Sequence, residues 1–596
     1  MIVYDGPHYS SVTSRSAPDQ SQNEYDEGSG PYQSGEFEHG RVPDAGQDRD
    51  RRHSDQHNTQ HAYHDRRYRQ GEHGLQQRQP LPHRRSMPHR GAAGAPIPVI
   101  RVISMAEKPA HDRAKDDKPD NGRPEPTDDL VSTAHTISIG ADTLAYTATT
   151  GRIVLRKEVV DEGKFDGHQA KAEVFLTSYT RDGADPRTRP VTFAFNGGPG
   201  SSSVWLHLGL LGPRRVISGD AGALQPPPYD LVDNVDTLLT DSDLVFIDPV
   251  STGYSRAAQG ENPAEYHGFT GDLESVGEVI RLWTSRNGRW MSPKFLAGES
   301  YGTLRAAGLA AHLQERHGLY LNGLMLISSV LDMGTIRFHE GNDLPYALFL
   351  PTYAAIAHYH GLHGDRPLAE VVAEAEEFAA RDFLWALHQG DRLTAGQRAE
   401  IAAKLASLTG LSAGYLDRVN LRVEHVRFYT ELLRDRRLVT GRMDARFTGS
   451  DVDYGREHFT EDPSYLAILG PYTAALNQYV RAELEYANDL PYEILTGNVQ
   501  PWSYKEFEGA AVSVSEKLAS AMRANPHLKV HVAFGYHDGA TPYFAAEYVL
   551  AHLAIPAELR ANIEREYYPA GHMMYVHEPS RIAQSGHLAR FVRSAS

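Results

Sequence analysis

The chain has 596 residues, enough for a large folded core with additional segments, and its 60 Lys and Arg residues against 77 Asp and Glu residues give a net charge of −17. This acidic balance argues against nucleic acid or an anionic membrane as a partner of the whole chain, because both select a basic surface. The chain has no cysteine, which excludes disulfides, cysteine-bound metal and thiol catalysis.

No apolar run approaches the roughly 18 residues that a membrane-spanning helix needs. The residues from Met1 to Tyr4 lead directly into a polar stretch, without the basic and long apolar regions of a secretory signal. We therefore expect a cytoplasmic protein with no membrane contact. Met105 is a candidate for an alternative start of translation.

Residues 1–128 are predicted to form a disordered N-terminal region that is polar and rich in histidine. Such a composition buries too little apolar surface to offset a backbone entropy of about 1–2 kcal/mol per residue. His53, His57, His61 and His64 repeat at helical spacing, which is one pattern of a metal-binding tract. The composition favours a His-rich tail instead, and we predict no metal site.

The rest of the chain is predicted to fold as an α/β core in two parts, residues 129–335 and 501–596, separated by a helical cap insertion at residues 336–500. In both parts of the core, short apolar strands alternate with amphipathic helices. This alternation predicts a mostly parallel sheet with helices on both faces. The insertion contains Ala/Glu-rich helical stretches at 368–387 and 398–408.

The first strands of the core are expected at 135–147 and 152–160, which flank Gly151 as the arms of a hairpin would. The later strands are short apolar runs, as in a sheet that is covered on both faces. These later strands are expected at 172–179, 191–195, 244–247, 294–297, 323–327 and 529–534, and the helices at 273–284, 304–315 and 544–553.

The strongest catalytic signal is the sequence Gly298-Glu299-Ser300-Tyr301-Gly302, which lies between an expected strand and an expected helix. This is the context of a nucleophile elbow, in which flanking glycines allow a tight turn that lifts the serine hydroxyl out of the sheet. The helix that follows directs backbone N–H groups toward negative charge that develops at the turn. Ser300 is therefore the candidate nucleophile.

A glycine-rich loop at residues 196–203, with the sequence NGGPGSSS, follows the expected strand 191–195. Glycines in such a loop let backbone amides approach a reacting carbonyl without a Cβ in the way. The N–H groups of Gly198 and Tyr301 are the candidates for a two-donor oxyanion hole. No Lys-Ser/Thr pair follows the glycines, which argues against a phosphate-binding loop.

A serine nucleophile needs a base, which in turn needs an acid to orient it, and α/β-hydrolases carry these groups in the order Ser, Asp, His. Asp538 follows an expected strand, at the carboxyl end where active sites assemble. His572 lies in a glycine-containing loop near the C-terminus. The rival bases are His537, which is adjacent to the acid, His577, and His587, which falls in an expected terminal helix.

Together these segments resemble the serine carboxypeptidase family, and they occur in the family's order across about residues 190–580. Several linked motifs are much more specific than any one of them alone. The matching motifs are Asn196–Ser202, Asp248–Ser255, Gly298–Gly302, the segment around Asp538, and Gly571–Met573.

The resemblance implies an α/β-hydrolase fold that needs no cofactor, with Ser300 as the nucleophile, His572 as its base and Asp538 as the acid that orients the base. It implies that the amides of Gly198 and Tyr301 form the oxyanion hole. It also implies a peptide substrate with a free C-terminus, whose α-carboxylate is bound by Asn196, Gly197 and Glu299. The family includes dimers, which makes a homodimer one option for this chain.

The chain departs from the family at positions that bear on carboxylate recognition. Ala194 stands where members with this recognition scheme have Trp, and Leu210 stands where they have a second Glu. Glu299 therefore lacks its usual carboxyl partner, although a protonated Glu299 can still donate to a carboxylate, which favours binding at mildly acidic pH. The candidates for a compensating positive charge are Arg214, Arg215 and Arg305.

Three functions remain open at this point. The first is a serine carboxypeptidase that acts through an acyl-enzyme. The second is an esterase or acyltransferase with the same catalytic groups, which the loss of the carboxyl partner favours. The third is a non-catalytic binding module, which is disfavoured because all three catalytic positions are filled. We interpret Asp248 as part of a structural turn and not as a second catalytic acid.

Overall fold

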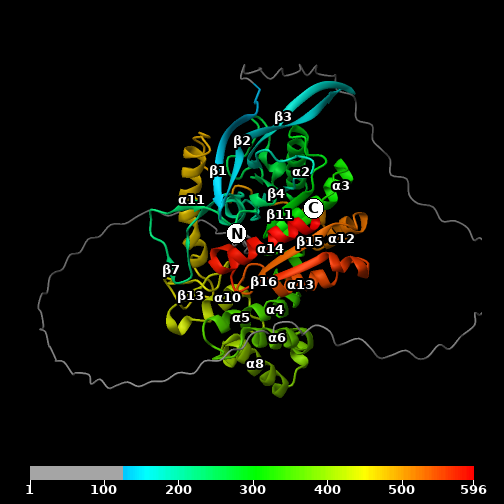
Figure 1. The fold of residues 1–596 in the computed structure, drawn as a ribbon. Helices are drawn as coiled ribbons and strands as arrows, with labels where there is room; N and C mark the ends of the chain where they lie inside the picture. Colours follow the sequence, from blue (N-terminus) through cyan, green and yellow to red (C-terminus); the bar gives the residue numbers. More distant parts are fainter. Residues whose placement is uncertain (1–124) are drawn as a thin grey trace, which may run out of the picture. The chain divides into compact units, whose positions relative to one another are not determined.

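The computed structural model of the chain describes residues 125–596 (Figure 1). The histidine tract and Met105 lie outside the described residues, as does the predicted N-terminal region up to residue 124. Among the described residues, none of the helices combines the length and the apolar character needed to cross a membrane.

A ten-stranded sheet runs through the centre of the described chain (Figure 1). In order across the sheet, its strands are β1 (Asp129–Ile139), β2 (Asp142–Asp161), β3 (Lys164–Arg181), β9 (Asp243–Ile247), β4 (Val191–Phe195), β11 (Lys294–Glu299), β12 (Gly323–Ile327), β15 (Lys529–Gly535) and β16 (Ile563–Tyr568), with β10 (Arg256–Ala257) paired to β3. Neighbouring strands are parallel from β9 onward, whereas β1, β2, β3 and β10 pair antiparallel. The mostly parallel sheet that the sequence predicts is confirmed.

Alternate side chains of the central strands enter two separate apolar cores, one on each face of the sheet. In β4, Phe193 and Phe195 belong to one core, and Ala194 between them belongs to the other. In β12, Leu326 belongs to the first core and Met325 belongs to the second. Because both faces are covered, the central strands β4, β11 and β12 are buried along their whole length and lack the polar alternation of a half-exposed sheet.

Helices cover both faces, as the alternation of strands and helices predicts. One core is shared with α2 (Phe269–Arg286), α3 (Tyr301–His317), α12 (Ser515–Ala524) and α13 (Tyr543–Ala551). The other core is shared with α1 (Val204–Leu206), α11 (Pro463–Ala482) and α14 (Glu578–Ala595). Three small two-stranded sheets pair β5 (Arg214–Val216) with β8 (Leu231–Asp233), β6 (Gly219–Asp220) with β7 (Ala223–Leu224), and β13 (Val439–Thr440) with β14 (Thr448–Gly449).

The first hairpin turns at a different place from the one the sequence suggests. The turn lies at Gly140 and Ala141, whereas Gly151 sits inside β2 and pairs with Leu130 of β1. An added Cβ at Gly151 would lie 1.9 Å from the backbone oxygen of Asp129, and its φ is +144°. The glycine is needed for close contact between strands and not for a turn, and sequence alone does not separate these two uses.

The segment between β12 and β15 is mainly helical. The expected helix at 368–387 is divided, because a π-helical turn at Ala379–Phe383 joins α6 to α7. In Figure 1, α6 and α8 lie at the lower edge of the view, away from the sheet. In chain order, the helices before α11 are α4 (Leu344–Leu348), α5 (Leu350–Tyr359), α6 (Leu368–Phe378), α7 (Leu384–Gln389), α8 (Ala395–Thr409), α9 (Ala413–Arg418) and α10 (His425–Glu431).

An irregular stretch at residues 483–504 follows α11 and lies against loops of the core. Isolated β-bridges join Leu495 to Ser201 in the glycine-rich loop and Ser503 to Gly268 at the start of α2. This contact brings side chains from a distant part of the sequence to the edge of the sheet where the parallel strands end.

Candidate active site

The predicted catalytic residues lie at the carboxyl ends of the parallel strands. Ser300 directly follows β11, and the glycine-rich loop begins at Asn196, directly after β4. Asp538 and His572 lie shortly after β15 and β16. Because these strands are parallel, their carboxyl ends share one edge of the sheet, and the four segments are brought together there.

Ser300 occupies a strained turn of the kind that an elbow requires. Its φ of 61° and ψ of −129° are uncommon for a residue that has a side chain. An added Cβ at Gly298 would lie 2.2 Å from the backbone oxygen of Gly302, and one at Gly302 would lie 2.9 Å from that of Phe195. The glycines on either side of Ser300 therefore allow the strand, the helix and the neighbouring loop to pass closer than side chains permit.

Asp538 and His572 form a buried hydrogen-bonded pair. Asp538 Oδ2 lies 2.8 Å from His572 Nδ1, and the two residues are 0 % and 3 % exposed. Asp538 Oδ1 accepts hydrogen bonds from the backbone N–H groups of Ala540 at 2.8 Å and Thr541 at 2.9 Å. The Thr541 hydroxyl donates to Asp538 Oδ2 at 2.7 Å. These contacts hold the carboxylate with one oxygen toward the imidazole.

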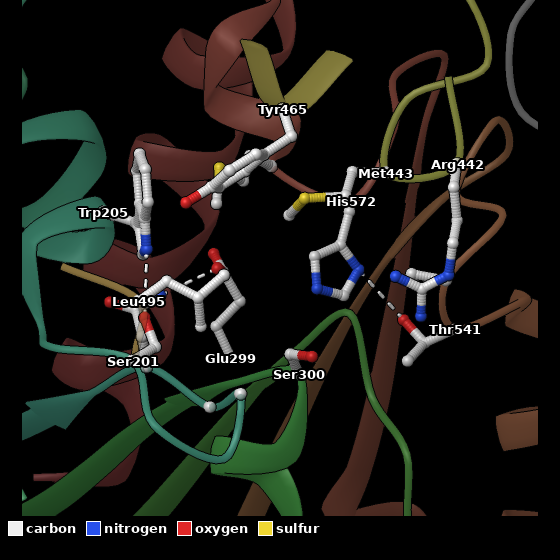
Figure 2. A pocket seen from close by; sticks show the side chains of 15 residues that line it. Ser201, Trp205, Glu299, Ser300, Arg442, Met443, Tyr465, Leu495, Thr541 and His572 are labelled. Carbon is white, nitrogen blue, oxygen red and sulfur yellow. Dashed lines mark hydrogen bonds between the residues drawn. The ribbon is translucent and has the colours of Figure 1, made fainter. Parts of the chain in front are cut away.

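Ser300 and His572 line the same pocket, whose volume is about 40 Å³. Figure 2 shows the His572 ring facing the Ser300 hydroxyl. In the same view, Glu299 and Trp205 lie on one side of this pair, and Arg442 lies on the other side. The pocket therefore has two distinct ends, with the serine and the histidine between them.

The rival histidines are engaged elsewhere. His537 is buried against Tyr359, with the ring centroids 5.3 Å apart, and burial lowers the pKa of His537 to about 3. His577 and His587 bond to other side chains and do not line the pocket. Of the four histidines, His572 is the one that contacts the predicted acid.

The glycine-rich loop passes directly beside the start of α3. Gly197 and Gly198 line the pocket, and an added Cβ at Gly197 would lie 2.4 Å from the backbone nitrogen of Tyr301. Gly198 has a φ of +103°, which is unfavourable for a residue with a side chain. Tyr301 is the first residue of α3, so its N–H has no acceptor within the helix. The predicted oxyanion-hole residues are therefore neighbours beside Ser300.

Glu299 is buried at one end of the pocket, where it contacts Asn196. The side-chain amide of Asn196 donates to Glu299 Oε1 at 2.7 Å, and the Tyr575 hydroxyl donates to Oε2 at 2.8 Å. Burial raises the pKa of Glu299 to about 7, although the nearby His572 and the two hydrogen bonds oppose the shift. This carboxyl therefore changes its charge near neutral pH, where an ordinary glutamate is fully ionised.

None of the three arginines considered as partners of Glu299 lines the pocket. Arg305 is buried, with Nε 2.8 Å from Asp272 Oδ2, and it also donates to the backbone oxygen of Asn196 at 2.6 Å. It supports the glycine-rich loop from behind. Arg214 and Arg215 form ion pairs with acidic side chains outside the pocket.

Asp248 is buried and holds two loops together. Its Oδ1 accepts hydrogen bonds from the backbone N–H of Ser203 at 2.8 Å and from the Ser203 hydroxyl at 2.7 Å, and its Oδ2 accepts one from Tyr492 at 2.8 Å. Burial raises the pKa of Asp248 to about 6. Asp248 does not line the pocket, so these contacts support its interpretation as part of a structural turn.

Thr541, Tyr575 and Arg442 are among the residues of the site that were not identified from the sequence. Thr541 follows Asp538 closely, and a hydroxyl just after a site carboxylate is a weak signal that was available. Tyr575 follows His572 closely, but an aromatic residue in that loop has no pattern that distinguishes it. Arg442 lies between α10 and α11, and no local motif connects it with the catalytic segments.

Comparison with known proteins gives an extended match to a family model. A family model described as serine carboxypeptidase matches residues 166–587. Serine carboxypeptidase-like 11 of Arabidopsis thaliana is 25 % identical over 160 residues, which are 26 % of this chain and 35 % of that protein. The chain therefore spans about a third of the length of this curated relative.

Solved structures that match the chain are distant in sequence and have low TM-scores. A proline iminopeptidase from Mycobacterium smegmatis shares 14 % identity, covers 78 % of this chain and 98 % of its own, and has a TM-score of 0.29. A haloalkane dehalogenase loop variant from Bradyrhizobium elkanii shares 13 % identity, covers 78 % and 99 %, and has a TM-score of 0.28.

The parallel sheet, the helices on both of its faces and the strand–turn–helix at Ser300 define the class of the protein as an α/β-hydrolase. The family match begins in β3 and extends through the parallel strands and the helices between β12 and β15 to the middle of α14, and it leaves β1 and β2 outside. The chain belongs to the serine carboxypeptidase family, which is a family of hydrolases.

Proposed function

We propose that the protein is a serine carboxypeptidase that releases the last residue of a peptide through an acyl-enzyme. The observation that carries this proposal is that Ser300, His572 and Glu299 line one pocket, with Asp538 bonded to the far side of the imidazole. The chemistry and the group that recognises a free C-terminus are thus side by side.

In the proposed reaction, His572 accepts the proton of Ser300 as the hydroxyl oxygen attacks the scissile carbonyl carbon. His572 then gives this proton to the nitrogen of the departing amino acid, and the acyl ester on Ser300 remains. Water attacks the ester with the same base and frees the shortened peptide. Asp538 holds the Nδ1–H tautomer, so that Nε2 faces the serine, and it stabilises the imidazolium.

The oxyanion that forms in both steps is assigned to the backbone N–H groups of Gly198 and Tyr301. These donors are fixed by the glycine-rich loop and by the first turn of α3, so they need no rearrangement as charge develops. Removing one such donor costs on the order of 3 kcal/mol in related chemistry. The strained backbone of Ser300 places the attacking oxygen beside them.

Recognition of the substrate's α-carboxylate is assigned to Asn196, Gly197 and Glu299. An ionised Glu299 would repel a second carboxylate in a buried pocket, so the protonated form is the one that binds substrate. The pKa of about 7 makes that form available at neutral and mildly acidic pH. The side-chain amide of Asn196 orients the carboxyl group of Glu299 through its hydrogen bond to Oε1.

The side chains that close the pocket support a capping role for the segment between β12 and β15. Arg442, Met443, Tyr465 and Leu495 all come from this segment and line the catalytic pocket. We therefore assign the helical insertion as a cap that shapes the substrate site, in addition to its packing against the core.

Replacing Ser300 with Ala tests the catalytic assignment. We expect turnover to be lost while the melting temperature stays nearly unchanged, because the substitution removes one hydroxyl oxygen. Full activity in Ser300→Ala would exclude the proposed nucleophile. The substrate class is then tested with N-blocked dipeptides that bear a free carboxylate, compared with their C-terminal amides and with simple esters.

The alternative function is an esterase or acyltransferase that uses the same catalytic groups. One observation favours it, which is that Leu210 is buried in an apolar core and supplies no carboxyl group to Glu299. Preference for the free-acid dipeptide over its amide supports the carboxypeptidase, whereas equal or faster cleavage of esters supports the alternative.

A further inference from the structure

A second, much larger cavity adjoins the catalytic pocket. Its volume is about 630 Å³, against about 40 Å³ for the catalytic pocket. Arg442 and Ala540 line both spaces, and Pro199, the neighbour of Gly198, lines the larger one. Because Arg442 lies on the side of His572 away from Glu299 (Figure 2), the large cavity extends the site in the direction opposite to the carboxylate-binding groups.

The direction of the substrate follows from the proposed function, on which this step rests. If Glu299 holds the α-carboxylate of the departing residue, then the other side of the scissile bond leads past His572 toward Arg442. The residue before the scissile bond therefore has its side chain at the junction of the two spaces, and the rest of the peptide enters the large cavity.

The wall of the large cavity combines aromatic rings with guanidinium groups. The guanidinium carbon of Arg337 lies 5.2 Å from the centre of the Tyr504 ring. Neither Arg337 nor Arg442 forms an ion pair with any residue in the described part of the chain, and both are half-buried. The aromatic residues of the wall are Phe338, Phe349, Trp502 and Tyr504.

The other ionisable groups of the wall leave its charge positive. Burial and the charge of Arg442 lower the pKa of His425 to about 3, so this ring is neutral. Within the described part of the chain, Glu424 is the one acidic residue that lines the cavity, and no ion pair joins it to either arginine. His339 is exposed at the rim. Two guanidinium groups and one carboxylate thus face the space.

We propose that this cavity is an acyl-side subsite that selects peptides with an acidic residue, Glu or Asp, next to the scissile bond. Arg442 binds the side-chain carboxylate, and Arg337 adds to the positive charge deeper in the cavity. A guanidinium without an ion-pair partner is suited to this task, because its fixed fork matches a carboxylate and its burial strengthens the pairing. The aromatic wall then packs the rest of the peptide.

The test compares N-acetyl-Glu-Leu with N-acetyl-Gln-Leu, which differ by one charge and almost nothing in shape. We expect kcat/KM of the full-length enzyme to favour the Glu substrate about tenfold, on the scale of a hydrogen bond to a charged group. The preference decreases as salt is added. A ratio near one, or a preference for N-acetyl-Lys-Leu, would overturn the proposal.

Variants assign the preference to named residues. In Arg442→Gln we expect the ratio of kcat/KM for the Glu substrate to kcat/KM for the Gln substrate to fall toward one. In Arg442→Lys this ratio should be intermediate, and in Arg337→Gln it should fall less than in Arg442→Gln. Arg418→Gln is the matched control, because Arg418 is an exposed arginine of α9 outside both cavities, and its loss changes the net charge equally. A ratio that survives in Arg442→Gln, or that falls equally in Arg418→Gln, would also overturn the proposal.

Two further readouts separate this proposal from the proposed function. N-acetyl-Glu and N-acetyl-Gln ethyl esters need no carboxylate recognition, so a Glu preference in the esters supports the subsite even if no peptide is cleaved. Calorimetry with Ser300→Ala measures binding of the two dipeptides without turnover, and a tenfold tighter Kd for the Glu peptide is expected. Equal Kd values together with equal ester rates reject the subsite, whatever the outcome for peptidase activity.

Discussion

The Tyr575 hydroxyl donates a hydrogen bond of 2.8 Å to Glu299 Oε2, so a phenol and not a second carboxyl group contacts this oxygen. Two carboxyl groups that share a proton bind substrate best in acid, because one of them must stay protonated. A tyrosine stays neutral here, since burial, and next the charge of Glu299, raise its pKa well above the usual value. Under the proposed function, Glu299 is therefore the carboxyl whose charge controls recognition at this end of the pocket.

Tyr575→Phe is expected to extend cleavage of free-acid substrates to higher pH. The hydroxyl donates to Glu299 and favours its ionised form, so removing it raises the pKa of Glu299 above about 7, by about one unit for one lost hydrogen bond. In the proposed function the protonated form binds the substrate's carboxylate, so the fall of kcat/KM with rising pH should move upward by the same amount. The measurement is the pH profile of kcat/KM for an N-blocked dipeptide.

The matching ester serves as the internal reference for this experiment. It has no carboxylate to recognise, and it uses the same catalytic base, so the ratio of the two rates isolates the titration of Glu299. Tyr472, whose phenol group also senses the charge of Glu299, stays in place as a second hydroxyl of the same region. The ratio of the free-acid rate to the ester rate falls with rising pH. If the midpoint of this fall is at the same pH in Tyr575→Phe and in the unaltered enzyme, the assignment of the titration to Glu299 is contradicted.

Glu299→Gln is expected to stabilise the protein at pH 8 and to change its stability little at pH 4.5. The pKa of Glu299 rises from 4.5 to about 7 in the folded chain, so its ionisation opposes folding as pH rises through this window. The full effect is about 3 kcal/mol, from about 1.4 kcal/mol per pKa unit. Urea unfolding of both proteins at the two pH values measures it, and a difference that does not depend on pH would argue against a buried titrating carboxyl.

Much of the local structure around Ser300 was predictable from sequence because each part depends on neighbouring residues. The turn at Ser300 needs glycine on both sides, and the apolar runs of β4 and β12 follow directly from burial on both faces. The contacts of Glu299 were not predictable, because Tyr575 lies in a short 3-10 helix that is 276 positions away in sequence. Arg442 was not predictable for the same reason, because it lies between α10 and α11, far in sequence from the other residues of the pocket. Gly151 was misplaced because a glycine in a close strand pair looks like a glycine in a turn.

Thr541→Val is expected to lower kcat on the order of tenfold with little change in KM. The Thr541 hydroxyl donates to Asp538 Oδ2 at 2.7 Å, the oxygen that also contacts His572, and both residues are buried. Without this donor the carboxylate loses one of its fixed contacts, and the imidazole is held less firmly. Steady-state kinetics on one good substrate gives the two constants. Thr541→Ser keeps the hydroxyl and should keep kcat, and an equal loss in both variants would point to packing instead.

Arg305→Met is expected to destabilise the protein by about 3–5 kcal/mol, because it leaves the Asp272 carboxylate buried without its partner. Arg305 and Asp272 are 1 % and 2 % exposed, and burial raises the pKa of Asp272 even with the arginine present. The loss should therefore shrink at low pH, where the carboxylate takes up a proton.

The control for Arg305→Met is Arg381→Met, which breaks a pair whose side chains are 71 % and 66 % exposed and should cost less than about 1 kcal/mol. Urea unfolding compares the two variants, and Arg305→Met with Asp272→Leu should recover part of the loss, since no charge is then buried alone. Activity measurements test a second role of Arg305, which donates to the backbone oxygen of Asn196 at the start of the glycine-rich loop. If Arg305→Met and Arg381→Met lost equal stability, the buried pair of Arg305 and Asp272 would not support the glycine-rich loop as described. If the double variant regained stability without regaining kcat/KM, the hydrogen bond to Asn196 would be the part that serves catalysis.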